Sequence, residues 1–202
     1  MLWRRRKRMR SMSSGSGELA NAALTDLWNG EIGLQGDGTQ PEKITVIGLG
    51  NTLYTDEGVG IHVLPLLEEI LAGTENIEII EGSTDGIRLL GPVEDTDQLI
   101  LLDSINGGAP PGHLYTVERE DIPAYCNVKM SVHQLGFQEV LFAARIRERL
   151  PARMVLFGVQ PASLEFGIGL SDTVRGRLAG LAELVNRQVR EWRSAPWTAG
   201  NL

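Results

Sequence analysis

The sequence predicts an α/β fold: a three-layer sandwich in which helices flank a mostly parallel, twisted sheet that carries an antiparallel strand at one edge. Short runs of aliphatic and β-branched residues alternate along the chain with amphipathic stretches, as in proteins whose parallel strands are joined by helices. Glycine accounts for 24 of the 202 residues. This share is well above the usual value of about 7%, which indicates many tight turns and close backbone contacts rather than a helical bundle.

Four short apolar runs are expected to form the buried parallel strands, because strands covered on both faces show continuous rather than alternating hydrophobicity. They are residues 43–48 (KITVIG), 77–81 (IEIIE), 98–103 (QLILLD) and 154–159 (MVLFGV). Residues 113–119 (HLYTVER) alternate between apolar and polar side chains. That pattern is typical of a strand with one solvated face, so this segment is expected at the antiparallel edge.

Three segments carry apolar residues at helical spacing. The first is 59–71, and Pro65 within it predicts either a kink or a helix that starts nearer the proline. Residues 135–150 give a clean amphipathic pattern. Residues 171–193 begin with a Ser-Asp capping signal and continue an apolar stripe, which predicts one long closing helix.

Composition divides the chain into three parts. Residues 1–41 combine a basic tip with Ser/Gly-rich passages and are expected to be a flexible extension, in which 18–28 offers a short helix. Residues 42–195 are expected to form the α/β domain, and 196–202 a flexible tail. A domain of about 150 residues buries roughly 70% of its unfolded surface without disulfides or structural metals.

The charge distribution restricts the partners of the folded domain. Residues 1–10 hold six of the 19 Lys and Arg and no acid, so the remaining residues carry 13 bases against 26 acids. Such an acidic body repels phosphate backbones, so we expect no nucleic-acid binding by the folded domain. The single cysteine, Cys126, excludes an internal disulfide framework. The sequence shows neither an apolar signal-peptide region nor a membrane-spanning run, so we expect a cytoplasmic protein.

The candidate functional residues follow the predicted strands, because ligands of open α/β sheets bind at the carboxyl ends of the strands. Glu57 lies in the loop after the first strand, Glu81 and Asp85 after the second, and Asp103 at the end of the third; His133 precedes the helix at 135–150. Two carboxylates and one imidazole suit Zn²⁺, Ni²⁺, Mn²⁺ or Fe²⁺ and leave coordination positions open. Turn or helix capping by the acids and a structural role of His133 are the alternatives.

Nucleotide binding and nucleophilic catalysis are less well supported by these motifs. Gly48-x-Gly50 follows a strand as in dinucleotide-binding loops, but Leu53 replaces the third glycine and two acids follow. The sequence also contains neither a Walker phosphate-binding motif nor a GxSxG nucleophile elbow. His62, His113 and Cys126 lack neighbours that would make them ligands or nucleophiles, and structural or surface roles are expected for them.

Five motifs occur in order between residues 43 and 193, and together they resemble a known family. They are Gly48-x-Gly50-Asn51-x-Leu53-x-x-Asp56-Glu57-Gly58-Val59-Gly60, Gly82-Ser83-Thr84 with Leu89-Leu90, Asp103 after an aliphatic strand, Ser131-x-His133-Gln134-Leu135, and Gly158-Val159-Gln160-Pro161. In this pattern the chain is similar to the NiFe-hydrogenase maturation endopeptidases. The basic extension and Pro65 depart from the family pattern.

The resemblance implies a cytoplasmic, monomeric endopeptidase that removes the C-terminal peptide from a hydrogenase large-subunit precursor after nickel insertion. In that family the positions of Glu57, Asp103 and His133 contact the nickel. The metal is then presented by the precursor, and the enzyme is expected to hold no tightly bound metal or other cofactor of its own. Nickel would act either as a Lewis acid or as a docking element while Glu57 activates water. The alternative from another class is a chaperone that binds nickel or the precursor without cleaving it.

Overall fold

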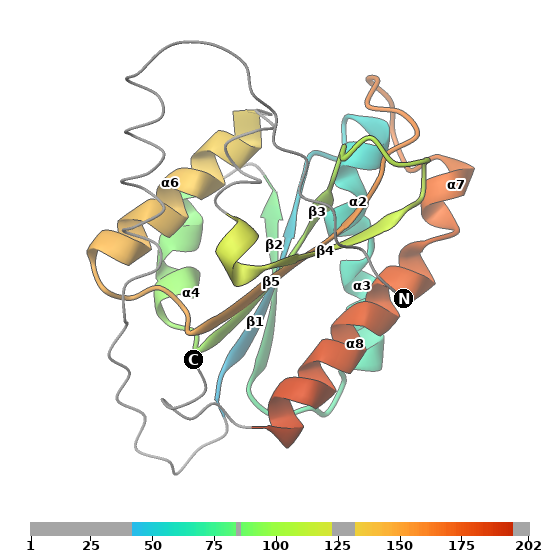
Figure 1. Ribbon diagram of the computed structural model, residues 1–202. Helices are drawn as coiled ribbons and strands as arrows, with labels where there is room; N and C mark the ends of the chain where they lie inside the picture. Colours follow the sequence, from blue (N-terminus) through green and yellow to red (C-terminus); the bar gives the residue numbers. More distant parts are fainter. Residues whose placement is uncertain (1–41, 84–85, 123–131, 196–202) are drawn as a thin grey trace, which may run out of the picture. The chain divides into compact units, whose positions relative to one another are not determined.

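The computed structural model describes residues 42–83, 86–122 and 132–195, and for 83 and 132–135 it describes the backbone alone. A five-stranded sheet in the order β2-β1-β3-β5-β4 forms the centre (Figure 1). Its strands are β1 (Ile44–Leu49), β2 (Ile77–Ser83), β3 (Gln98–Ser104), β4 (Leu114–Glu118) and β5 (Arg153–Val159). All neighbouring pairs are parallel except β4 with β5, so the predicted antiparallel edge strand is confirmed.

Helical segments connect the strands and cover both faces of the sheet, which confirms the predicted fold class (Figure 1). α3 packs against α8 on one face, and α4 packs against α6 on the other. The segments are η1 (Thr55–Gly58), α2 (Val59–His62), α3 (Leu64–Ile70), η2 (Gly86–Leu89), α4 (Leu90–Glu94), η3 (Arg119–Asp121), α6 (Val132–Ile146), α7 (Asp172–Arg175) and α8 (Leu178–Ser194).

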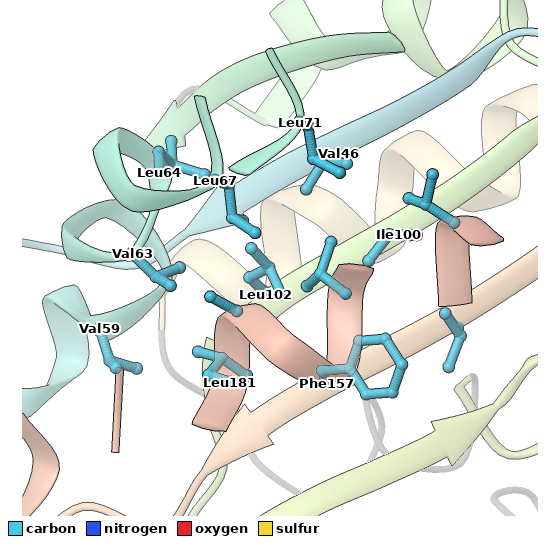
Figure 2. Packing of buried hydrophobic residues seen from close by; sticks show 14 of the residues in the cluster. Val46, Val59, Val63, Leu64, Leu67, Leu71, Ile100, Leu102, Phe157 and Leu181 are labelled. Atoms are coloured by element: carbon cyan, nitrogen blue, oxygen red, sulfur yellow. The ribbon is translucent and has the colours of Figure 1, made fainter. Parts of the chain in front are cut away.

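Alternate residues of the central strands supply the two halves of the core. Val46, Ile100, Leu102 and Phe157 belong to a buried cluster with the apolar side chains of α2, α3 and α8 (Figure 2). The intervening strand residues are buried as well. Full burial of such a side chain contributes about 1.5–3 kcal/mol to the stability of the fold. Because the strands are buried on both faces, their sequences are continuous apolar runs.

The segment with Pro65 forms two helices rather than one. α2 ends at His62, and α3 begins at Leu64 with Pro65 in its first turn. A proline costs little there, because the first amides of a helix have no partner within the helix. The structure therefore agrees with the expectation that a helix starts near the proline.

The single long helix predicted for 171–193 is wrong. Ser171 caps α7 as expected, since its hydroxyl accepts a hydrogen bond from the Val174 amide at 3.3 Å. α7 then ends after Arg175, and the Arg177 amide donates to the Val174 carbonyl three residues back. Gly176 is a weak helix former, so this tighter turn separates α7 from α8.

The helix predicted for 135–150 is confirmed with shifted ends. α6 covers Val132–Ile146, so it begins and ends a few residues earlier than expected. Glu148 adopts a left-handed backbone conformation with φ 56°, and Pro151 follows shortly after. A left-handed residue followed by a proline is a common end signal of helices.

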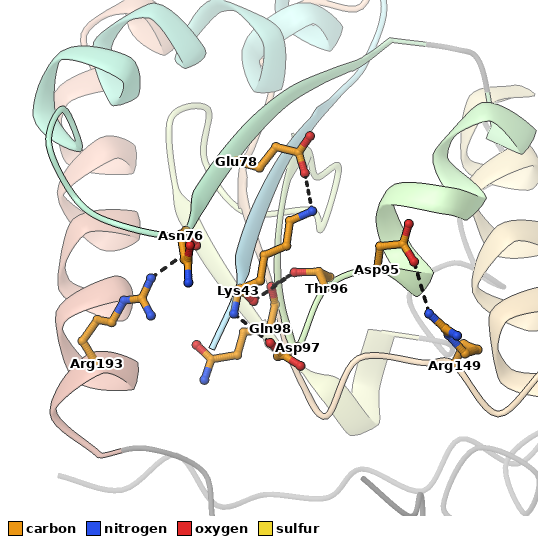
Figure 3. Close-up of polar contacts among 9 residues, drawn as sticks. All are labelled: Lys43, Asn76, Glu78, Asp95, Thr96, Asp97, Gln98, Arg149 and Arg193. Carbon is orange, nitrogen blue, oxygen red and sulfur yellow. Dashed lines mark hydrogen bonds and ion pairs between the residues drawn. The ribbon is translucent and has the colours of Figure 1, made fainter. Parts of the chain in front are cut away.

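Polar side chains form hydrogen bonds and an ion pair near the amino-terminal ends of the strands (Figure 3). The Lys43 amide donates to Asp97 Oδ2 at 2.7 Å, and Lys43 Nζ pairs with Glu78 Oε2 at 2.7 Å. Arg193 at the end of α8 donates to the Asn76 carbonyl at 3.3 Å. Of these contacts Lys43–Glu78 is an exposed ion pair, and such a pair contributes at most about 1 kcal/mol to the stability of the fold.

A cluster of acids at the end of β4 predicts a pH-dependent stability. Partial burial raises the pKa of Glu118 above its usual value, and the neighbouring carboxylates of Glu120, Glu191 and Asp121 raise it further. A raised carboxyl pKa favours the protonated form in the folded state, so stability falls as the pH rises from the ordinary pKa through the raised one. We expect Glu118→Gln to increase the melting temperature slightly at pH 7. The increase should vanish below the ordinary pKa of glutamate in a thermal-denaturation series against pH, whereas an increase that is equal at all pH values would contradict the electrostatic cause.

Candidate functional site

The glycines of the first loop allow the chain to pack backbone against backbone at the carboxyl end of β1. A Cβ added to Gly50, whose φ is +126°, would collide with the Glu57 carbonyl, and one added to Gly60 would collide with the Leu49 and Leu102 carbonyls. Only glycine permits such close approach and such a φ. The space beside Gly50 is thus occupied by the chain itself, which leaves no support for a dinucleotide phosphate at this turn.

Glu57 lies in η1, directly after this glycine turn. Its amide donates to the Tyr54 carbonyl at 2.8 Å, and its side chain is half-buried. η1 packs against β3 as well as following β1. The predicted carboxylate therefore stands at the carboxyl edge of the sheet, over its central strands.

Asp103 lies near the end of β3, between β1 and β5 in the sheet. Its side chain is only 4% exposed, and its Oδ1 accepts a hydrogen bond from the Ser104 amide at 2.7 Å. That bond fixes the orientation of the carboxylate. Because Leu102 directly precedes it and lies against Gly60 of α2, Asp103 stands at the same edge as Glu57.

His133 is the second residue of α6, and its side chain lies outside the described residues. The backbone places the start of α6 by a close contact between two glycines. A Cβ on Gly86 of η2 would come within 2.6 Å of the Gly136 main chain. η2 follows β2 closely, so this contact brings the first turn of α6 towards the carboxyl edge of the sheet (Figure 1).

Of the other candidates, Glu81, His62 and His113 lie within the described residues. Glu81 is exposed on β2, where it pairs in register with Gly48, and Asp85 lies outside the described residues. His62 is half-buried in α2. His113 is exposed, with its ring against Tyr115 at a centroid distance of 4.7 Å. These positions agree with the structural or surface roles expected for the two histidines, while Cys126 also lies outside the described part.

Asp56 has no predicted role from the sequence, yet it is fully buried and connects two segments that are distant in the chain. Its Oδ2 accepts hydrogen bonds from the amides of Ala162 and Ser163 at 2.8 and 3.0 Å and from the Ser171 hydroxyl at 2.9 Å. Its Oδ1 accepts from the Ser171 amide at 2.7 Å. Adjacent carboxylates thus have different surroundings: Asp56 holds residues 162–171 in place, and Glu57 stands at the sheet edge. No local sequence pattern predicts the structural role of Asp56, since its hydrogen-bond partners are more than 100 residues away.

Gln160 is a second residue without a predicted role. It is buried at the end of β5, where its Oε1 accepts hydrogen bonds from the Tyr115 hydroxyl at 2.8 Å and the Gly108 amide at 3.0 Å. Its Nε2 donates to Asn106 Oδ1 at 3.0 Å. The side chain therefore organises the connection between β3 and β4, and the Gly-Val-Gln-Pro motif that contains it has a structural basis.

Among the side chains that the structure describes, which exclude that of His133, no three His, Cys, Asp or Glu residues form a metal-binding group. In the same part of the chain, no helix combines the length and the apolar character needed to cross a bilayer.

Comparisons with known proteins agree with the resemblance seen in the motifs. Residues 61–188, a stretch that includes Asp103 and His133, match the family model of the HycI hydrogenase maturation proteases. The hydrogenase expression/formation protein HupD of Rhodobacter capsulatus is 38% identical over 156 residues, which are 76% of this chain and 74% of that protein. The hydrogenase 2 maturation protease of Escherichia coli K12 is 38% identical over 150 residues, or 74% and 92% of the two chains.

Solved structures show the same relationship. The hydrogenase maturating endopeptidase HybD from E. coli superposes with a TM-score of 0.69 at 37% identity, covering 74% of this chain and 93% of that one. HybD from Thermococcus kodakarensis, at 23% identity and a TM-score of 0.62, shares the fold. Sequence identity, coverage and fold agree, and the chain belongs to the hydrogenase maturation protease family.

Proposed function

We propose that this protein is an endopeptidase that removes the C-terminal peptide of a NiFe-hydrogenase large-subunit precursor once nickel has been inserted. The observation that carries the proposal is the arrangement of Glu57 and Asp103. Glu57 comes from η1 and Asp103 from the end of β3, and both lie at the carboxyl edge of the sheet, towards which α6 directs its first turn, in a chain of the maturation protease family. His133 in that turn completes the proposed set.

In this proposal nickel belongs to the substrate. Glu57, Asp103 and His133 contact the ion that the precursor presents, so a precursor without nickel offers these side chains nothing to bind. Carboxylate oxygens and an imidazole nitrogen are suitable nickel ligands. Cleavage would then report that metal insertion is complete.

Peptide hydrolysis also requires an activated water. Glu57 is the proposed general base, because it is half-buried at the sheet edge, whereas the Asp103 carboxylate is buried and oriented by the Ser104 amide. A positioned general base contributes about 10²- to 10⁴-fold to a rate. Polarisation of the scissile carbonyl by the substrate's nickel would add to this contribution.

The test is the intact mass of a large-subunit precursor, prepared with and without nickel and incubated with the protein. Loss of one defined C-terminal peptide from the nickel-loaded precursor alone would support both the protease and its dependence on nickel. Cleavage of both forms would remove the nickel requirement and retain the protease. Stable binding without any mass change would favour the non-cleaving chaperone instead.

The contact between η2 and α6 gives a prediction about this geometry. In Gly86→Ala the new Cβ would meet the α6 main chain at 2.6 Å, so η2 and the helix with His133 must move apart. Displacement of a catalytic group by about 1 Å can cost up to 10²-fold in rate, and we expect precursor cleavage to slow at least about tenfold. Gly91→Ala in α4 is the matched control, because a Cβ there meets no atom within 4 Å. Equal rates for both variants would contradict the positioning role of this contact.

A further inference from the structure

An exposed apolar surface lies beside Glu57 and has no part in the proposed chemistry. It is formed by two short segments, 53–54 and 164–168, that are more than 100 residues apart in the sequence. The members of this apolar patch share a large hydrophobic side chain that is at least 40% exposed: Leu53, Tyr54, Leu164, Phe166 and Ile168. Phe166 and Ile168 extend furthest into solvent, with exposed fractions of 75% and 91%.

The patch is a built surface rather than a chance grouping of side chains. Tyr54 and Gly167 form a parallel β-bridge, the Gly167 amide donates to the Leu53 carbonyl at 2.9 Å, and the Thr55 amide donates to the Gly167 carbonyl at 2.9 Å. The rings of Tyr54 and Phe166 meet edge to face with centroids 5.9 Å apart. Because these bonds order the backbone in advance, a partner that binds here loses less conformational freedom on the enzyme side.

The position and charge of the patch indicate which partner it receives. Tyr54 is bonded through its carbonyl to the Glu57 amide at 2.8 Å, so the patch is continuous with the segment that carries the proposed general base. A second copy of the chain is a poor occupant, since each copy carries a net charge of −7 and the copies repel each other. Within the two segments Glu165 is the only charged residue, so this surface offers a partner mainly apolar contact.

We propose that this apolar patch docks an apolar surface segment of the hydrogenase large-subunit precursor and thereby holds the precursor over Glu57. The inference rests on the proposed function, because it identifies how that same substrate is bound. Large apolar anchors in preordered pockets or protrusions carry much of the affinity of protein interfaces. Contacts that bind the substrate and the transition state equally lower KM without changing kcat.

The test compares Phe166→Ser/Ile168→Ser with wild type on the nickel-loaded precursor, measuring cleavage kinetics and, separately, equilibrium binding of the precursor. We expect KM and Kd to rise at least about tenfold while kcat changes little. Ile146→Ser at the end of α6 is the control, since its side chain is also large, apolar and 65% exposed. The melting temperature should not fall, because the two substituted side chains are solvated.

The outcomes separate the two proposals. If wild type cleaves the precursor and the double variant keeps wild-type KM and Kd, the docking role is overturned and the proposed function stands. If wild type neither binds nor cleaves the precursor, the proposed function fails and the docking role fails with it. If the double variant changes only self-association in sedimentation and leaves precursor binding intact, the patch is a homodimer surface and the inference is wrong.

Discussion

Glu57→Gln is expected to abolish precursor cleavage and to leave the protein folded. Glutamine keeps the shape of the side chain, but it neither accepts the proton of an attacking water nor offers a negative charge to the substrate's nickel. The expected fall in kcat/KM is at least about 10²-fold, the lower bound for loss of a positioned general base. Since Glu57 is half-buried and outside the apolar core, thermal denaturation should show a nearly unchanged melting temperature. The measurement is the intact mass of the nickel-loaded precursor over time.

Glu81→Gln provides the matched control, because Glu81 is an exposed acid on β2, the strand that pairs with β1. It should cleave at the wild-type rate. Asp103→Asn and His133→Ala should lose cleavage as Glu57→Gln does, and normal processing by all three variants would refute the proposed site. A single active variant would remove only that residue from the set.

The same variant separates the two roles of nickel. If Glu57→Gln still binds the nickel-loaded precursor with wild-type Kd but does not cleave it, Glu57 acts on the water. If binding of the loaded precursor weakens to the level of the nickel-free form, Glu57 acts as a nickel contact. The comparison requires only the precursor in its two metal states and a binding measurement that is independent of cleavage.

The sheet could be predicted from the sequence because its signals are local. β1, β3 and β5 are buried on both faces, so their residues form uninterrupted aliphatic runs, and β4 alternates because one of its faces is solvated. The long closing helix could not be divided correctly, since the apolar stripe continues across Gly176 while the hydrogen bonds do not. A stripe records which face is buried, and it does not record whether the helix is continuous.

The candidate site was predictable only in part. Residues at the carboxyl ends of parallel strands reach the same edge by topology, which is why Glu57 and Asp103 both lie at that edge. For Asp56 and Glu57, in contrast, the sequence gives no signal that tells a structural acid from a functional one. Their different surroundings depend on residues 162–171. Contacts between segments so far apart leave no periodicity, so the structural role of Asp56 required the fold.

Asp56→Ala is expected to have the largest effect on stability among these substitutions. It removes the acceptor of four hydrogen bonds, from the amides of Ala162, Ser163 and Ser171 and from the Ser171 hydroxyl, and leaves those donors in a partly buried loop without their partner. Each unsatisfied donor costs about 1–3 kcal/mol, reduced where water can enter. We expect the free energy of unfolding to fall by about 3 kcal/mol or more, measured by urea denaturation.

Two further variants test whether the loss comes from these hydrogen bonds. Asp56→Asn keeps one carbonyl oxygen for the donors that meet Oδ2 but turns an NH₂ group towards the Ser171 amide, so its destabilisation should lie between those of wild type and Asp56→Ala. Asp172→Asn replaces an exposed acid next to the same loop and should change stability by less than about 0.5 kcal/mol.

Hydrogen exchange should show faster exchange of the Ala162, Ser163 and Ser171 amides in Asp56→Ala. If these amides stay protected in a folded Asp56→Ala protein, another group holds the loop, and the apolar patch that the loop carries owes its order to the bridge at Tyr54 and Gly167 instead.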